Sequence, residues 1–539
     1  AEFGIDSSGV KALTSMDRDE LVFRRINFKS NADRDKKILE LIGKHTGHYI
    51  DEHGRKKNSV GLVFCLTVGK FKDKPALNRI VPLIKNNFSG SVETFHGKMD
   101  TADKEAAQST FMAEDFAGVM VCTTAFGMGI DKENIKFTIN TALPKSIEEF
   151  YQQAGRAGRD ADKSEKSYCY ILYMPEDAAK SELIEEIFNP NTEINRRKTL
   201  SGQLKNDLNS VMYFWNLSKY SVAEEYEKIR TRLAELENGW RDFDFHSEGE
   251  LRELQYVLYK IALLGIVKNW TINYSSLDSG TVSVEYGGFA EENVRRELLR
   301  YIHKHDAEFS LDGKNIRAEK WLEDLIKLLI EWTNDTILYS RLQSIYNMMR
   351  FCAEEISDAE FRVRINDYFK YTDQTVILDA IAQNPREFKN WFAVLENAGE
   401  SVSKAKSILA ALMRYLESYG NNTGLNYLSG MLRLICGEFR GNEEWRLETS
   451  LQNIKKRADS AEILSRTIAR AKNFNAAEKN MFSEIFLKIY PERVEEIYRE
   501  LQDAHSLSAI VDGQAARLSK VLEAYTRGKI FKQAEKFDR

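Results

Sequence analysis

Two arginines three positions apart could bind a polyphosphate. Arg156 and Arg159 stand in a segment interrupted by Gly155 and Gly158, so both guanidinium groups can face one side. Glycine leaves room for a phosphate or another backbone to come close, and the planar guanidinium fork matches phosphate oxygens. An arginine that reaches a phosphoryl group during its transfer stabilises transition-state charge and raises the rate by roughly 10³–10⁵. The pattern predicts this chemistry.

Three polar turns follow short apolar runs elsewhere in the same part of the chain. Thr67, His96 and Thr123 each come at or just after the end of such a run. A hydroxyl and free N–H groups at a strand-to-helix turn form an anion site that suits a nucleic-acid phosphate. Open α/β sheets bind ligands at the carboxyl ends of their strands. We therefore expect the three turns at one edge of a sheet.

Each of these features alone has a more ordinary interpretation. A Gly-x-Gly turn is most often just a turn, an isolated arginine is usually a solvated surface charge, and His96 alone would more often be a loop histidine. The order and spacing of the segments together favour the functional interpretation.

These segments resemble the second motor lobe of superfamily 2 helicases, and most of all the RecQ family. Residues Ala125–Lys132 (Ala-Phe-Gly-Met-Gly-Ile-Asp-Lys) resemble motif V of that family, and Tyr151–Asp160 resembles its motif VI. The turn Phe95-His96-Gly97 resembles its histidine-containing turn. The resemblance runs from about Leu21 to Pro175, which is under a third of the 539 residues.

The resemblance implies an ATP-dependent DNA helicase that uses ATP with Mg²⁺ and moves 3′ to 5′. Arg159, with Arg156 beside it, would be the arginine finger, and Gln152 would sense the nucleotide. Gly129 and Asp131 would link the nucleotide cleft to the nucleic-acid track. The residues expected on nucleic acid are Thr67, His96, Thr123 and Phe126.

The chain also departs from the family pattern. It contains no Gly-x-x-x-x-Gly-Lys-[Ser/Thr] loop, so we expect the first RecA-like lobe, which holds most of the ATP, to be missing and this chain alone to be inactive. Asp51-Glu52-His53 resembles a magnesium-binding Asp-Glu box, but it lies in the polar stretch His48–Asn58 and not at a buried strand end, so we interpret it as a loop. No suitably spaced cysteines follow Cys169, so the RecQ zinc module is absent. The sequence indicates a divergent relative.

Composition limits the class of protein. Hydrophobic residues make up 43% and charged residues 29%, which is ordinary for a globular chain. The net charge of −5 argues against a surface coated with phosphate-binding charge, although a local basic track needs only a few residues. Five cysteines without a C-x-x-C pair favour reduced thiols over zinc or disulfides. We expect an intracellular, cytoplasmic protein with no membrane span.

Apolar runs alternate with amphipathic stretches up to about residue 180, which predicts an α/β RecA-like lobe with a parallel sheet and helices on both faces. The expected strands are Leu21–Phe28, Val60–Leu66, Val92–Phe95, Val119–Thr123, Phe137–Asn140 and Tyr168–Tyr173. The expected helices are Ala32–Lys44, Ala76–Lys85, Thr101–Glu114 and Ile147–Ala154. The expected divisions are 1–15 (remnant of an inter-lobe linker), 16–180 (lobe), 181–240 (helical connector), 241–289 (winged helix) and 290–539 (all-helical, role unknown).

The segment 241–289 has a helix followed by a hairpin pattern. Glu248–Leu264 has helical spacing, and Ile266–Tyr274 and Thr281–Tyr286 flank a turn. This is typical of a winged helix but also of any small α+β insert. In a winged helix, some side chains of this segment would contact phosphates or bases. In a structural module, the same side chains would be solvated or packed. They are Arg252, Lys260, Lys268, Trp270 and Tyr274.

Two hypotheses remain open from the sequence. The favoured one is the C-terminal portion of an ATP-driven DNA helicase or translocase, with the missing lobe and DNA (single strand, duplex or fork) as partners. The alternative is a non-catalytic platform that binds nucleic acid or protein, with 290–539 as a scaffold or the site of a protein partner. The residues do not decide between DNA and RNA.

Overall fold

The computed structural model describes residues 18–50, 54–69, 74–126, 130–159, 166–217, 219–236, 239–275, 279–287, 289–370, 372–438 and 444–501. The chain divides into two compact units. The first comprises Ala1–Tyr371 with Glu417–Gly420, and the second Thr372–Leu416 with Asn421–Arg539. Within the described residues, no helix is both long and apolar enough to cross a membrane.

The first unit contains the predicted parallel sheet, with the strand order β1-β7-β6-β3-β5-β4. The central strands β5 and β6 are buried along their whole length, as expected for a parallel sheet covered on both faces. The strands are β1 (Leu21–Asn27), β3 (Lys56–Phe64), β4 (Ser91–Phe95), β5 (Gly118–Cys122), β6 (Ile135–Asn140) and β7 (Ser167–Tyr173). Each predicted strand is present, with shifts of up to four residues at its ends.

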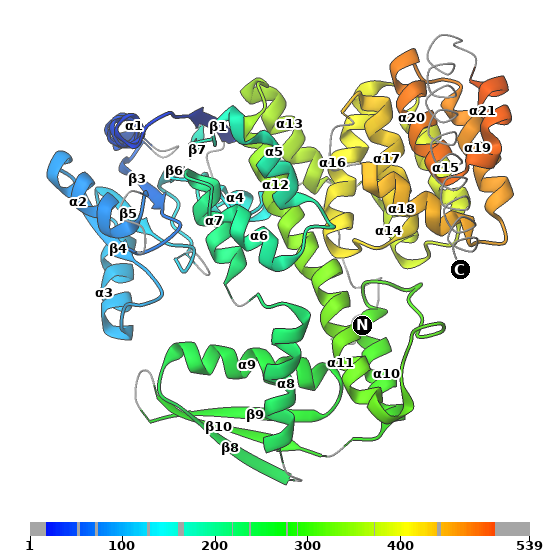
Figure 1. Cartoon of the computed structure of the whole chain (residues 1–539). Coiled ribbons are helices and arrows are strands. Elements are labelled where there is room, and N and C mark those ends of the chain that lie inside the picture. The colour runs from blue at the N-terminus through cyan, green and yellow to red at the C-terminus, as the bar shows by residue number, and fades with distance from the viewer. Residues whose placement is uncertain are drawn as a thin grey trace, which may run out of the picture. The chain divides into compact units, whose positions relative to one another are not determined.

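Helices cover both faces of this sheet (Figure 1). On one face, Ile38 of α1 and Ile80 of α2 join a core with strand residues such as Val63. On the other, Phe150 of α4 packs edge-on against Phe23 of β1, with ring centroids 5.3 Å apart. The helices are α1 (Asn31–His45), α2 (Leu77–Asn87), α3 (Thr101–Met112) and α4 (Ile147–Ala154), as predicted to within a few residues.

The polar stretch interpreted as a loop is largely a hairpin. β2 (Gly47–Ile50) pairs antiparallel with the start of β3, from Lys56 to Ser59. Its residues are mostly exposed, and Ile50 is 59% exposed. The pairing therefore depends on backbone hydrogen bonds without a buried face, which leaves no alternation of apolar residues in the sequence. Asp51-Glu52-His53 lies outside the described residues.

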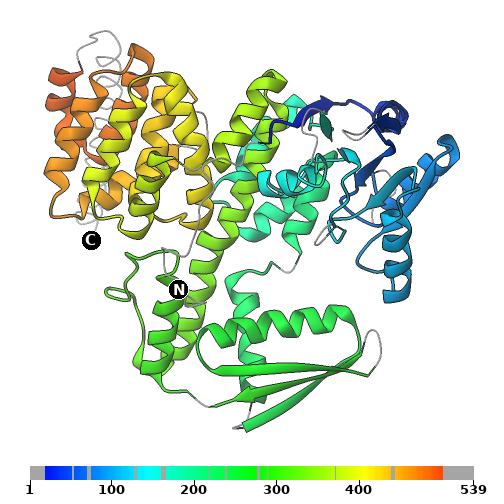
Figure 2. The same cartoon turned by 180° about the vertical axis from the view of Figure 1, so that it is seen from behind.

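The segment after the parallel sheet is helical, as the sequence predicts, and its α-helices α5 to α8 lead into a small three-stranded antiparallel sheet of order β8-β10-β9. Helix α9 lies along this sheet in both views (Figures 1 and 2). The helix and the predicted hairpin are present, together with one strand, β8, that the sequence did not indicate; the winged-helix assignment stays a prediction. The elements are α5 (Ser181–Phe188), α6 (Ile194–Ser201), α7 (Asp207–Asn216), α8 (Val222–Glu235), β8 (Gly239–Phe245), α9 (Glu248–Leu263), β9 (Val267–Tyr274) and β10 (Gly280–Tyr286).

The remaining chain is helical, but the division between units lies at residue 371 rather than near 290. Helices α10 and α11 share one apolar core with the three-stranded sheet, where Val294 and Leu325 pack in the same cluster as Val282. The elements of this part in the first unit are α10 (Glu291–Ile302), η3 (Ala318–Lys320), α11 (Trp321–Thr333), η4 (Asn334–Leu338), α12 (Tyr339–Ala353) and α13 (Asp358–Phe369).

The second unit is a helical bundle with its own core around Trp391, whose side chain is fully buried. Its elements are α14 (Asp373–Gln383), α15 (Phe388–Ala398), α16 (Val402–Ser418), α17 (Thr423–Cys436), α18 (Glu444–Lys455), α19 (Ser460–Ala471), α20 (Ala476–Ile489), η6 (Pro491–Arg493) and α21 (Val494–Glu500). The last residues of α16 belong to the first unit.

Candidate functional site

Three of the predicted side chains follow strands that end at one edge of the parallel sheet. The strand register places the last residues Phe64, Cys122 and Phe95 in one row. Thr123 comes directly after β5, and its N–H donates to the carbonyl of Phe95, 3.1 Å away. His96 comes directly after β4, and Thr67 lies three residues beyond β3. The carboxyl edge thus brings these residues together as expected.

The side chains at this carboxyl edge suit an anion. Thr67 and Thr123 are half-buried, and neither hydroxyl has a hydrogen-bond partner within the described residues. His96 has a buried Nδ1 atom without a partner. Burial lowers the pKa of His96, and the charges of Lys104 and Lys98 lower it further. His96 is therefore neutral at pH 7, and the two lysines supply the positive charge beside it.

Phe126 lies inside the lobe and not on its surface. It is 2% exposed, and its ring packs against Phe95 and Phe111 with centroids 4.9 and 5.6 Å away. Its N–H donates to the carbonyl of Thr123 at 3.0 Å, so it supports the turn that carries that hydroxyl. This corrects the expected contact of Phe126 with nucleic acid, because its ring has no face available to a ligand.

The arginine pair lies at the opposite, amino edge of the same sheet. Helix α4 runs back from the carboxyl edge and ends at Ala154, with Gly155 as its C-cap. The N–H of Gly158 donates to the carbonyl of Ile135, the first residue of β6. Gly158 has a left-handed backbone with φ of 66°. A Cβ atom there would lie 2.8 Å from Cγ of Glu20, so both conformation and packing require glycine.

Both guanidinium groups at this amino edge are accessible to solvent. The Arg159 side chain is 30% exposed and pairs with Asp131 at 2.9 Å, while the Asp131 side chain is 76% exposed. Arg156 is half-buried and has no ion pair within the described residues. Burial lowers the pKa of Arg156, and the charge of Arg159 lowers it further. Two neighbouring cations with one exposed carboxylate between them leave capacity for an added anion.

The remaining residues implied for the nucleotide are placed as follows. Gln152 is exposed in the last turn of α4, whereas Arg156 lies in the turn that follows this helix. Asp131 lies in the segment that connects the carboxyl end of β5 to the amino end of β6. This segment therefore spans both edges. Gly129, within the same segment, lies outside the described residues.

Comparison with known proteins finds similarity in the part of the chain that forms the carboxyl and amino edges of the parallel sheet. Residues 37–161 match the family described as "Helicase conserved C-terminal domain". The chain is 35% identical over 136 residues to the ATP-dependent DNA helicase RecQ of Bacillus subtilis, covering 25% of this chain and 21% of the relative. It is 32% identical over 195 residues to the RecQ-like DNA helicase blm-1 of Caenorhabditis elegans, covering 35% and 18%. Residues 37–161 are thus similar to a helicase C-terminal domain, and we call the α/β part of the chain that contains them the RecQ-like lobe, after these relatives.

The match is confined to a fraction of each protein, since the chain spans about a fifth of the length of these relatives. Among solved structures, the C-terminal domain of the DEAD-box protein Dbp5 aligns over 40% of this chain and 99% of that chain at 15% identity, with a TM-score of 0.23. The activity of the full-length relatives therefore belongs to those proteins.

An arginine that the sequence did not single out holds the motif VI turn of the RecQ-like lobe. Arg18 donates to the carbonyls of Gly155 (2.9 Å), Ala157 (3.0 Å) and Gly158, and it pairs with Glu20 at 2.6 Å. These bonds tie the residues just before β1 to the turn that presents Arg156 and Arg159. The sequence gives no local signal for them, because the partners lie 137 to 140 residues apart.

Cysteines and metal ligands offer no second chemical site in the described part of the RecQ-like lobe. Burial raises the pKa of the Cys65 and Cys169 thiols to about 12, so both stay protonated at neutral pH. Within the described residues, no group of three or more His, Cys, Asp or Glu could hold a metal ion.

The residues considered for a winged helix, outside the RecQ-like lobe, are divided between surface and core. Lys260 is 3% exposed and pairs with the buried Glu225 at 3.4 Å, so it is a packing residue and its interpretation as a phosphate contact is corrected. Arg252 is exposed and pairs with Glu248. Trp270 packs against the core of this module. Residues that stay available at the surface are Lys268 and Tyr274.

Proposed function

We propose that this chain is the C-terminal portion of an ATP-dependent DNA helicase or translocase that moves 3′ to 5′. The observation that carries the proposal is the pair of accessible arginines on the glycine turn of the RecQ-like lobe, at the edge opposite the turns of Thr67 and Thr123. One edge would meet the triphosphate and the other the nucleic-acid strand. A RecA-like lobe with a phosphate loop would supply the rest of the nucleotide site.

At the nucleotide, Arg159 would leave Asp131 and bind the γ-phosphate. The exposed ion pair with Asp131 contributes little stability, so Arg159 can exchange this carboxylate for a phosphate at a small cost in free energy. Arg156 would bind a neighbouring phosphate oxygen, and Gln152, in the last turn of α4, would contact the nucleotide. These residues fit the phosphate end of ATP. Because the described residues hold no cluster of metal ligands, Mg²⁺ would be bound by the phosphates and the other lobe.

At the carboxyl edge, the hydroxyls of Thr67 and Thr123 would donate to phosphates of one strand. His96 would act as a neutral hydrogen-bonding group, because its lowered pKa keeps it uncharged near pH 7. Lys98 and Lys104 would contribute the charge that makes binding depend on salt. Contacts of this kind position the strand without reading its sequence.

An ATPase assay with the Arg159→Ala variant tests the proposal. The chain is assayed with a RecA-like lobe that carries a phosphate loop, supplied in cis or in trans, with single-stranded DNA present. Removing an arginine finger should lower turnover by roughly 10³-fold or more while sparing most nucleotide binding. The control is Arg230→Ala, which removes a more exposed arginine that pairs with Glu227 on α8. Turnover in Arg159→Ala equal to that of the control would refute the assignment.

A DNA-binding assay separates this function from the non-catalytic platform. We expect the full chain to bind single-stranded DNA with affinity that falls as salt rises, and the double variant Thr67→Ala with Thr123→Ala to bind more weakly. Binding of DNA that persists without any ATPase activity in the completed two-lobe protein would favour the platform. A salt-independent signal with no preference among single-stranded, duplex and forked DNA would contradict both.

A further inference from the structure

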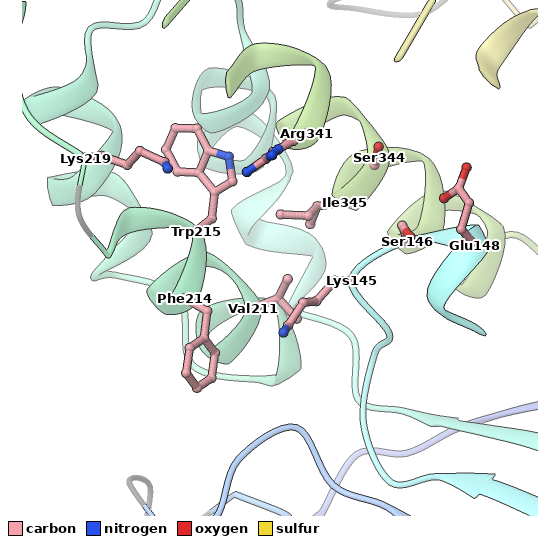
Figure 3. A pocket seen from close by; sticks show the side chains of 10 residues that line it. All are labelled: Lys145, Ser146, Glu148, Val211, Phe214, Trp215, Lys219, Arg341, Ser344 and Ile345. Carbon is pink, nitrogen blue, oxygen red and sulfur yellow. The ribbon is translucent and has the colours of Figure 1, made fainter. Parts of the chain in front are cut away.

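A pocket of about 340 Å³ lies between three helices of the first unit (Figure 3). Its walls come from the start of α4, from α7 with the residues after it, and from α12. This volume is near the lower end of the roughly 300–1,000 Å³ typical of ligand pockets, so the pocket suits one small ligand. We call this the cationic pocket, because its walls carry Lys145, Lys219 and Arg341.

None of these three cations has an ion pair within the described residues. The carboxylate that shares their pocket belongs to Glu148 and is hydrogen-bonded by the hydroxyl of Tyr368. Figure 3 shows Lys219 and Arg341 on either side of Trp215 at one end of the pocket, and Lys145 with Phe214 at the other. Three cations that lack carboxylate partners around one cavity favour an anionic ligand.

The rest of the lining is apolar and partly aromatic. Val211 and Ile345 are buried, and Phe214 is half-buried with the Lys145 Nζ atom 5.5 Å from its ring centroid. A flat ring can pack against such a wall while an attached phosphate contacts the cations, since stacking on aromatic side chains and basic contacts combine in single-strand binding. The lining therefore matches a nucleotide better than inorganic phosphate alone.

The pocket also continues the row of strand ends at the carboxyl edge. In the sheet, β6 lies next to β3 on the side away from β5 and β4. Thr141, directly after β6, donates from its N–H and its hydroxyl to the carbonyl of Phe64 at the end of β3, both at 3.0 Å. Lys145 follows four residues later. A strand that passes His96, Thr123 and Thr67 in order would next reach this pocket.

We propose that the cationic pocket binds one nucleotide of a single nucleic-acid strand, with the phosphate held by Lys145, Lys219 and Arg341 and the base against Phe214. This inference deepens the proposed function and rests on it, because it supplies the next contact of the same strand. The same chemistry would also accept a free nucleoside monophosphate, so the experiment has to separate the two sources.

The charge state of Lys219 gives an independent readout. Burial lowers its pKa to about 8, and the charges of Arg341 on α12 and Lys260 on α9 lower it further, whereas Glu225 on α8 raises it. Lys198 of α6 donates to the carbonyl of Lys219 at 2.5 Å. A bound phosphate favours the charged amine. Affinity for the strand should therefore fall between about pH 7 and about pH 9, and Lys219→Arg, which stays charged, should remove that part of the fall.

The main test measures anisotropy of labelled oligothymidylates of about four and about twelve nucleotides, lengths that bracket single-strand sites. In the full chain, the double variant Lys219→Gln with Arg341→Ala should weaken binding of the longer strand and reduce its salt slope by up to about 0.7, the value for one lost phosphate contact. The shorter strand should bind nearly as in the wild type. The control is Arg296→Ala with Arg300→Ala on α10, which removes two exposed charges that do not line the pocket.

The outcomes separate the inference from the proposed function. Wild-type binding by the pocket variant, together with weakened binding by the variant of Thr67 and Thr123, overturns the pocket alone. Wild-type binding by both variants overturns the nucleic-acid role of the lobe. If thymidine monophosphate displaces the labelled strand from wild type at a concentration similar to that of the unlabelled strand, and if the pocket variant binds the short and long strands with unchanged relative affinity, the pocket binds a free nucleotide and the proposed strand contact is overturned. Since Arg341 is exposed, Arg341→Ala alone serves as a folded variant, which should weaken binding of the longer strand less than the double variant does.

Discussion

Replacement of Glu417 by glutamine should change how the stability of this protein depends on pH. Burial raises the pKa of Glu417 to about 8, and the charge of Glu148 raises it further. The Tyr368 hydroxyl hydrogen-bonds Glu148 and lies 3.2 Å from Oε2 of Glu417. A protonated Glu417 can donate to the tyrosine oxygen while the tyrosine O–H donates to Glu148. The fold therefore keeps Glu417 neutral where an exposed glutamate is charged.

The magnitude follows from the displacement of that pKa. With an ordinary value of 4.5 in the unfolded chain, holding the carboxyl neutral at pH 7 costs about 3 kcal/mol of folding free energy. Because the folded pKa is the higher one, the contribution is most favourable below the unfolded pKa and is lost as pH rises through the folded pKa, from about 4.5 to about 8. Glutamine offers similar hydrogen bonds without a proton to lose.

Thermal unfolding of the full chain across this pH range measures the effect. Wild type should lose stability progressively between the two pKa values, and Glu417→Gln should show a flatter profile with higher stability at the upper end. Glu148→Gln is the companion variant: it keeps an acceptor for Tyr368 but removes the charge that disfavours ionisation of Glu417, so the loss of stability should end at a lower pH than in wild type and become smaller. A Glu417→Gln profile that superimposes on wild type would refute the protonated state.

Two further perturbations concern the elements that carry the edges of the lobe. Asp207→Asn should destabilise the first unit by about 3–5 kcal/mol, as measured by chemical unfolding. The reason is that the side chain of Arg34 is fully buried, 2.6 Å from Asp207, and would keep an uncompensated charge. The control Glu186→Gln, at an exposed pair with Arg196, should leave the free energy of unfolding unchanged. An equal response of both variants would contradict this. Gly158→Ala should lower the unfolding temperature more than Gly313→Ala, since both have positive φ but only Gly158 has atoms within 4 Å of an added Cβ. Equal losses would show that the backbone conformation alone matters.

The parallel sheet and its functional turns could be predicted because the signal is local. The runs at β5 and β6 are apolar throughout, and the glycines around Arg156 mark a turn whatever surrounds it. The exposed hairpin of β2 could not be predicted, because backbone pairing without a buried face leaves no periodic trace. Likewise β8 has mostly exposed residues, so its charged sequence does not read as a strand.

Contacts between segments that are distant in the sequence could not be predicted either. Arg18 reaches a turn 137 residues away, and the cationic pocket combines residues near 145, 215 and 341 that carry no common motif. Lys260 was interpreted from its residue type, which favours solvent, but the fold pairs it with Glu225 in the core. Phe126 was placed on nucleic acid by the motif around it, whereas its ring fills the space between β4 and α3. In each case burial, and not residue identity, decides the role.

The segment between β5 and β6 has one end fastened beside the hydroxyl of Thr123 and the other beside the arginine turn. Neighbouring β6 is six residues long, so the two attachments are separated by about 20 Å of strand. If Arg159 left Asp131 for a phosphate, Asp131 would lose this ion pair, so nucleotide binding would change the contacts at one end of the connection. Under the proposed function, lengthening this connection by a few glycines would uncouple ATP hydrolysis from binding of the nucleic-acid strand, while the residues at each end stay unchanged.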